Sequence, residues 1–152
     1  MPHLHDKIDF TVEVFIVFRN KVLLRRHDKF GIWLSVGGHI EPDEDPNQAA
    51  IREVKEEVGL DITLDDTRKL QKENPHELIP PYFLSRHHVT PTHEHITFIY
   101  FARTTSDKIT QTMLKEQSDE IRWFTKKELL VDTEILSEIK NYALAALTNF
   151  TL

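Results

Sequence analysis

Three glutamates, Glu53, Glu56 and Glu57, constrain this chain more than any other feature, because a helix would place all three on one face. Like charges at this spacing repel one another by roughly a few tenths of a kcal/mol per pair in an exposed helix. A cation that neutralises them would remove this cost. Hard divalent cations, above all Mg²⁺, take carboxylate oxygens as ligands and bind phosphates as partners. The cluster therefore predicts a metal–phosphate site.

The helix that carries these glutamates has clear start and stop signals. Asp45 is suited to cap it, Pro46 suits its first position, and Gln48 completes a capping box with Asp45. Gly59 stands where a helix commonly ends in a left-handed residue. Helical periodicity predicts one buried apolar stripe, made of Ile51, Val54 and Val58. The glutamates border this stripe, whereas a purely solvated acidic face would lie opposite it.

The longer segment from residue 38 to residue 60 resembles the Nudix (MutT-like) box. All fixed positions of that box are matched, by Gly38, Glu44, Arg52, Glu53, Val54, Glu56, Glu57, Gly59 and Leu60. Upstream, Trp33 with the Gly37-Gly38 pair is similar to the W-x-x-P-G-G segment of the family. Val36 departs from this pattern, because many members have proline there. We expect that departure to change the stiffness of the loop and not the binding of metal.

The resemblance implies an α/β fold, a Nudix-type α/β/α sandwich with a mixed β-sheet, formed by residues 1–152 as one domain. It also implies Mg²⁺-dependent hydrolysis, with Mn²⁺ as a substitute, of a phosphoanhydride bond in a nucleoside diphosphate linked to another group. Nucleoside triphosphates, ADP-ribose and nucleotide sugars are substrates of this kind. The alternative is a Nudix-like nucleotide-binding or sensor domain that has lost turnover. The intact set of acids favours the enzyme.

The same resemblance implies roles for the residues of the box. The three glutamates named above are the expected metal ligands, together with the main-chain carbonyl of Gly38. Arg52 is expected to pair with Glu44 and to orient the ligand carboxylates. Glu53 or Glu57 is also expected to act as general base through a metal-bound water.

A later loop is a second source of the general base. In MutT-type members an acid before the last strand of the sheet has this role, and Lys115-Glu116-Gln117 resembles that position. Glu116 is therefore the first choice outside the box, and Glu120 is the alternative. If both are solvated loop acids, the base comes from the box.

Histidines are frequent, and two of them are expected to bind substrate. On a strand, His93 and His95 share one face, whereas Glu94 points to the other. A structural or exposed position is the competing interpretation for both histidines. Their spacing also allows zinc, but no clear third ligand accompanies them in the sequence.

Aromatic residues are a further means of binding a nucleobase, by stacking. Trp33 is expected to contact substrate in this way, and Phe30, Tyr82 and Phe83 are other candidates. In a small α/β domain such residues more often belong to the core.

Composition excludes several classes of function. The net charge is −6 and no block of Lys or Arg stands out, so binding to a nucleic-acid backbone is disfavoured. The chain has no cysteine, which excludes disulfides, thiolate ligands and thiol nucleophiles. The longest apolar run, residues 14–18, is far too short to span a bilayer. We therefore expect a cytoplasmic protein without nucleic-acid or membrane partners, as a monomer or homodimer. The resemblance to the Nudix family implies that its partner is a nucleotide-type small molecule.

The remaining elements are expected to build a mixed α/β domain. Periodicity and β-branched residues predict strands at residues 11–18, 22–26, 33–36, 61–64, 94–103 and 120–124. Residues 73–81 are rich in proline and polar side chains and predict a loop. Thr125 and Glu128 form a capping box for a short helix, and apolar residues continue at helical spacing from Ile135 to Leu147.

Overall fold

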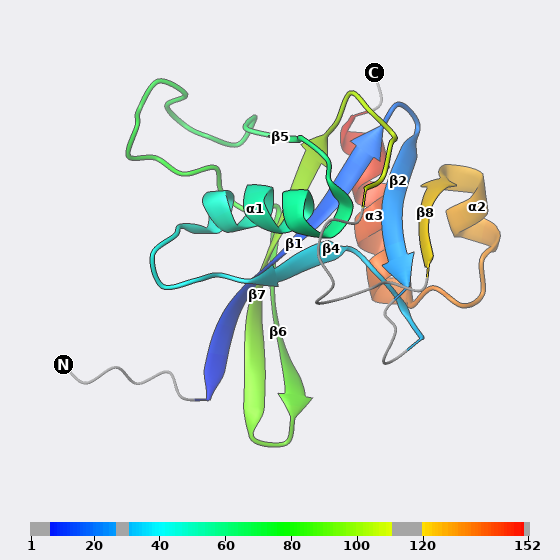
Figure 1. The fold of residues 1–152 in the computed structure, drawn as a ribbon, viewed down its shortest axis with the longest axis horizontal. Coiled ribbons are helices and arrows are strands. Elements are labelled where there is room, and N and C mark those ends of the chain that lie inside the picture. Colours follow the sequence, from blue (N-terminus) through cyan, green and yellow to red (C-terminus); the bar gives the residue numbers. More distant parts are fainter. Residues whose placement is uncertain (1–6, 27–30, 111–119, 151–152) are drawn as a thin grey trace.

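The computed structural model describes residues 7–26, 31–110 and 120–150. Within them, a mixed sheet of eight strands lies between helices on its two faces (Figure 1). The strands are β1 (Ile8–Phe18), β2 (Lys21–Arg26), β3 (Trp33–Leu34), β4 (Val36–His39), β5 (Thr63–Leu64), β6 (Phe83–Thr90), β7 (His93–Arg103) and β8 (Glu120–Thr125). The helices are α1 (Pro46–Val58), α2 (Lys126–Val131) and α3 (Ser137–Asn149). The predicted α/β/α sandwich with a mixed sheet is confirmed.

Strands β1 and β7 form the centre of the sheet and run parallel, in register from Ile8 opposite Glu94 to Val17 opposite Arg103. The other pairings among the described residues are antiparallel. Strand β2 pairs with the end of β1, and β4 pairs with its middle. As a result, the Gly37-Gly38 segment of β4 lies directly beside β1.

Two hydrophobic layers cover the two faces of the sheet, because successive residues of a strand point to opposite sides. On one side α1 packs against alternate residues of β1, among them Val12, Val14 and Ile16. On the other side α3 packs against the intervening residues, among them Phe15 and Val17. In the described part of the chain, no helix has the length and apolar character needed to cross a membrane.

The ends of α1 follow the sequence signals. The Asp45 carboxylate accepts a hydrogen bond from the main-chain N–H of Gln48, whose side chain accepts one from the N–H of Asp45 in return. Gly59 ends the helix with a φ of 72°, in the left-handed region that favours glycine. The boundaries of this helix were therefore predictable from local chemistry alone.

The predicted apolar stripe of α1 is wrong in one member. Ile51 is 48% exposed, whereas the buried positions of the helix are Ala49, Ala50, Val54 and Val58. The two alanines let the helix axis come close to the sheet, so that the line of contact shifts away from Ile51. Side-chain size, and not hydrophobicity alone, therefore determines which positions of α1 face the sheet.

Two strands differ from the sequence prediction. The segment predicted as one strand at residues 33–36 forms two, β3 and β4, which pair with different neighbours on either side of Ser35. Strand β6 was not predicted. It is mostly exposed and lacks the alternation of a half-buried strand, because it pairs with β7 in a hairpin that extends beyond the helices (Figure 1).

Glu13 on β1 carries a half-buried carboxyl group on the same face of the sheet as Phe15 and Val17. Burial raises the pKa of Glu13 to about 7. The Ser35 hydroxyl and the Arg25 guanidinium oppose this change, and the carboxylate of Glu138 on α3 adds to it. The sheet thus holds an acid whose neutral form the fold favours.

We predict that Gly37→Ala destabilises the fold. A Cβ atom at this position would overlap the main-chain carbonyl oxygen of Val12 on β1, and backbone cannot move aside as a flexible side chain can. The free energy of unfolding should fall by about 2 kcal/mol or more, measured by urea denaturation. Gly38→Ala is the control, because its Cβ would meet the movable carboxylate of Glu53 instead. An equal loss in both variants would contradict this account.

We predict that Glu13 makes stability depend on pH. Since folding raises its pKa, the neutral acid contributes stability that is fully present below about pH 4.5 and is lost as the pH rises through about 7. Glu13→Gln keeps a neutral side chain throughout, so at pH 8 it should be more stable than the natural protein by about 1–3 kcal/mol. Near pH 4.5 the two should be similar in urea denaturation.

The matched control for this pH effect is Glu134→Gln, which changes an exposed glutamate. It should show the same stability as the natural protein at both pH values. The account of Glu13 fails if the effect of Glu13→Gln is the same at pH 4.5 and pH 8.

Candidate functional site

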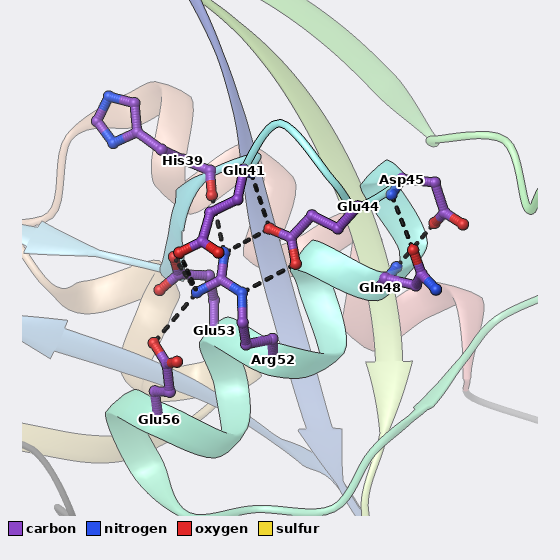
Figure 2. A network of polar contacts seen from close by, with 8 residues as sticks. All are labelled: His39, Glu41, Glu44, Asp45, Gln48, Arg52, Glu53 and Glu56. Carbon is purple, nitrogen blue, oxygen red and sulfur yellow. Dashed lines mark hydrogen bonds and ion pairs between the residues drawn. The ribbon is translucent and has the colours of Figure 1, made fainter.

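The side chain of Arg52 organises a polar network at the start of α1 (Figure 2). Its Nε and Nη2 atoms donate to the two carboxylate oxygens of Glu44, at 2.9 and 2.6 Å. Nη2 also donates to the main-chain carbonyl of His39 at 2.9 Å. Nη1 donates to Glu53 at 3.0 Å and to Glu56 at 3.1 Å. One guanidinium therefore holds three carboxylates and the end of β4 together.

The charges of this network stabilise one another. The hydrogen bond from Arg52 is the main reason that the pKa of Glu44 lies below its usual value, and it raises the pKa of Arg52 in turn. Glu44 also accepts a hydrogen bond from the main-chain N–H of Glu41 at 2.9 Å. The predicted pairing of Arg52 with Glu44 is thus present, and it fixes the loop between β4 and α1.

Glu53 lies directly against the main chain of Gly38. A Cβ atom at Gly38 would overlap the carboxylate of Glu53, so this side chain would have to move aside if Gly38 were replaced. Because Nη1 of Arg52 contacts both Glu53 and Glu56, the carboxylates of these two residues can converge on one positive centre. The arrangement fits a hard divalent cation with oxygen ligands.

Glu57, the third glutamate of the box, has a different environment. Its carboxylate forms an ion pair with Nε of Arg25 at 3.1 Å, and both side chains are less than one-tenth exposed. Arg25 also donates to the main-chain carbonyl of Ser35 at 3.3 Å. The structure therefore places Glu57 on the side of α1 that faces the sheet, with Arg25 as its cationic partner.

A cavity of about 270 Å³ adjoins the glycine pair of β4. Buried threonines of the two central strands are among its lining residues, and the hydroxyls of Thr11 and Thr97 are hydrogen-bonded to each other at 2.7 Å. The polar and titratable side chains of its lining include Glu13, Arg25, Ser35, His39, His87 and His95. This composition suits a polar or charged ligand, and the cavity extends from the start of the box to the histidines of β6 and β7.

The two histidines predicted to bind substrate differ in position. His95 lines the cavity, and burial, followed by the neighbouring His39, His87 and His93, lowers its pKa. The Nε2 atom of His93 instead lies 3.0 Å from the carboxylate of Asp9 on β1. Sequence reasoning missed Asp9, because only the parallel pairing of β1 with β7 brings it opposite His95.

The aromatic candidates differ in burial: Trp33 belongs to the core, Tyr82 is half-buried, and Phe83 is 41% exposed. Trp33 is 4% exposed and packs edge-to-face on Phe124, with ring centroids 5.1 Å apart. Tyr82 stacks on Phe101 at 4.3 Å. Trp33 therefore does not present the open ring face that stacking on a base requires, whereas the next residues, Leu34 and Ser35, line the cavity.

Of the two acids expected to act as general base outside the box, the structure describes only Glu120. Glu120 is exposed at the start of β8, opposite Arg26 of β2. Glu116 lies outside the described residues, as does Phe30.

Comparison with known proteins agrees with this geometry. The NUDIX domain family matches residues 9–145. A solved structure of a NUDIX-family hydrolase from Clostridium perfringens is 37% identical and covers 94% of this chain and 98% of that chain, with a TM-score of 0.84. The likeness thus extends over the whole domain and is not confined to the box.

Two curated relatives match over shorter segments. A CTP pyrophosphohydrolase of Escherichia coli (strain K12) is 40% identical over 58 residues, which are 36% of this chain and 43% of that protein. A dihydroneopterin triphosphate diphosphatase of Haemophilus influenzae is 47% identical over 57 residues, which are 37% of this chain and 36% of that protein. The matched segments span less than half the length of either relative. The family match and the full-length structural likeness together show that the chain belongs to the NUDIX family of hydrolases.

Proposed function

We propose that this protein is a Mg²⁺-dependent pyrophosphohydrolase that cleaves a phosphoanhydride bond in a nucleoside diphosphate linked to another group. The observation that carries the proposal is the contact of Arg52 with both Glu53 and Glu56, next to the main chain of Gly38. This oxygen-rich cluster adjoins the polar cavity through Gly38, which supports a cation site there. Phosphoanhydrides carry negative charge and need such neutralisation before water can attack them.

In this proposal, the carboxylates of the box and the Gly38 carbonyl hold the metal. A bound Mg²⁺ would supply Lewis-acid activation of the phosphate and acidify a bound water. Glu53 and Glu56 serve directly as ligands, since their oxygens already converge on one cation. Glu57, which pairs with Arg25, would serve either as a third carboxylate ligand or as the acceptor of a proton from the attacking water.

Arg52 acts as a positioning residue. Its planar guanidinium grips both oxygens of Glu44 and leaves Nη1 for Glu53 and Glu56. Lysine has no such fork and could not span these partners. The ligand carboxylates therefore keep their orientation through the bond that anchors Arg52 to Glu44.

Nucleoside triphosphates are the first substrate class that we propose. Both curated relatives described above carry the name of an enzyme acting on a triphosphate, CTP or dihydroneopterin triphosphate. In the cavity, Glu13 and Ser35 offer hydrogen-bonding groups for a base or sugar, and His95 lies on the side of β7. ADP-ribose and nucleotide sugars are the competing classes within the same reaction type.

A panel of nucleotides tests this function. Nucleoside triphosphates, ADP-ribose and nucleotide sugars are incubated with the protein and Mg²⁺, and release of pyrophosphate or a nucleoside monophosphate is followed. Turnover of at least one class supports the enzyme. Saturable binding of nucleotides without turnover would instead support the alternative, a nucleotide-binding domain that has lost activity.

We predict that Glu53→Gln and Glu57→Gln each lower the turnover rate by about 100-fold or more, because each removes a negative charge from the metal site. Glutamine keeps the size of the side chain, and circular dichroism checks that the fold survives, above all in Glu57→Gln, where the buried ion pair with Arg25 is lost. Glu134→Gln, at an exposed position outside the site, is the matched control. Near-normal rates for both box variants at saturating Mg²⁺ would show that the assigned site is wrong.

We predict that Glu116→Gln lowers the maximal rate more than it weakens substrate binding, since a general base acts on the transition state. Glu120→Gln is the matched comparison, because Glu120 is exposed at the start of β8. Steady-state rates are measured with metal and substrate at saturation. Normal rates in both variants would return the base role to the glutamates of the box.

A further inference from the structure

A second cluster of potential metal ligands adjoins the histidine end of the cavity. Asp9 stands at the start of β1, and His93 and His95 stand at the start of β7. This end of the sheet extends beyond the helices, together with the β6–β7 hairpin (Figure 1). The three side chains are partly buried, and none of them belongs to the Nudix box.

The parallel register of β1 and β7 creates this cluster. Asp9 is the direct partner of His95, so the side chains of both leave the sheet on the same face. His93, two residues earlier on β7, points to that face as well. Three ligand-bearing residues therefore share one face over two adjacent strands.

The distances within the cluster suit a small metal ion. One ligand atom of each residue lies within 4.8 Å of the corresponding atoms of the other two. Ligands bound to tetrahedral Zn²⁺ at about 2.0–2.2 Å stand roughly 3.3 Å from one another. The carboxylate of Asp9 lies 3.0 Å from Nε2 of His93, close to that value.

A fourth ligand is within reach. Nε2 of His39, at the end of β4, lies 3.3 Å from the same oxygen of Asp9. Its ring contacts that of His95 edge-on, with centroids 5.0 Å apart. One carboxylate oxygen of Asp9 thus lies close to the imidazole nitrogens of both His39 and His93. A cation bound between these three groups would accept a lone pair from each of them.

We propose that Asp9, His93 and His95 form a binding site for a transition-metal ion of the Zn²⁺ class, with His39 as an additional ligand. Imidazole favours Zn²⁺ and its neighbours in the first transition row, whereas carboxylate and carbonyl oxygens favour Mg²⁺. The chain would then carry two metal sites of different chemistry, this one and the all-oxygen box. The proposal stands on the described side chains and does not depend on the hydrolytic function.

Cobalt is the probe that separates the two sites. The full-length protein is stripped with a chelator and titrated with Co²⁺, whose visible absorption is strong in four-coordinate sites and weak in six-coordinate oxygen sites. We expect an intense band that saturates at one equivalent and disappears when Zn²⁺ is added. The affinity for Zn²⁺ is then measured by competition with a chromophoric chelator.

His93→Gln and His95→Gln should each abolish the intense band and weaken Zn²⁺ binding by about 100-fold or more, which exceeds the usual effect of losing an outer partner of a ligand. His88→Gln is the matched control, because His88 lies opposite Glu94 in the same hairpin and its side chain leaves the other face of the sheet. A Glu53→Gln/Glu57→Gln double variant should retain the band.

Histidine NMR resonances of the natural protein should shift on Zn²⁺ addition, which identifies the ligand rings even if a variant folds poorly.

Three results would overturn the proposal. The first is the absence of an intense Co²⁺ band in the natural protein, and the second is a band that survives both His93→Gln and His95→Gln. The third concerns His3 and His5 near the N-terminus of the sequence. Loss of the band in a His3→Gln/His5→Gln variant, with retention in His93→Gln, would assign the metal to that segment instead.

Discussion

The guanidinium of Arg52 is the group on which the arrangement of the box depends. Glu44, Glu53 and Glu56 would repel one another without it, and it contacts all three while remaining only about one-quarter exposed. In such a partly shielded position each charge pair is worth more than an open surface pair. The same group also binds the carbonyl of His39 and thereby ties the helix to the end of β4.

A second arginine neutralises the glutamate on the inner side of the helix. Arg25 of β2 pairs with Glu57, which is buried between α1 and the sheet. The acidic helix is thus held by one arginine from its own sequence and by one from the sheet. Because these two arginines contact different glutamates, the carboxylates are divided between an outer group that faces the loop and an inner one that faces the sheet.

Much of the helix that carries the glutamates could be predicted from local chemistry. The capping box and the terminal glycine involve residues close in sequence and appear in the structure as expected. The pairing of Arg52 with Glu44, which the resemblance to the Nudix box implied, is present as well. The predictions that were wrong or missing concern features that depend on tertiary packing. The exposure of Ile51 follows from the approach of α1 to the sheet, and β6 carries little apolar pattern because it lies in an exposed hairpin. Asp9 had no local signal at all, since its partners belong to a distant strand.

The separation of partners along the chain has a consequence for the order of folding. Arg52 and Glu44 are 8 residues apart, whereas Asp9 and His93 are 84 apart and meet only through the pairing of β1 with β7. Closing the longer loop costs about 2 kcal/mol more in chain entropy. The acidic cluster can therefore form early, around a single helix and its preceding loop. The histidine cluster can exist only after the two central strands have joined, so its presence reports that β1 and β7 have paired.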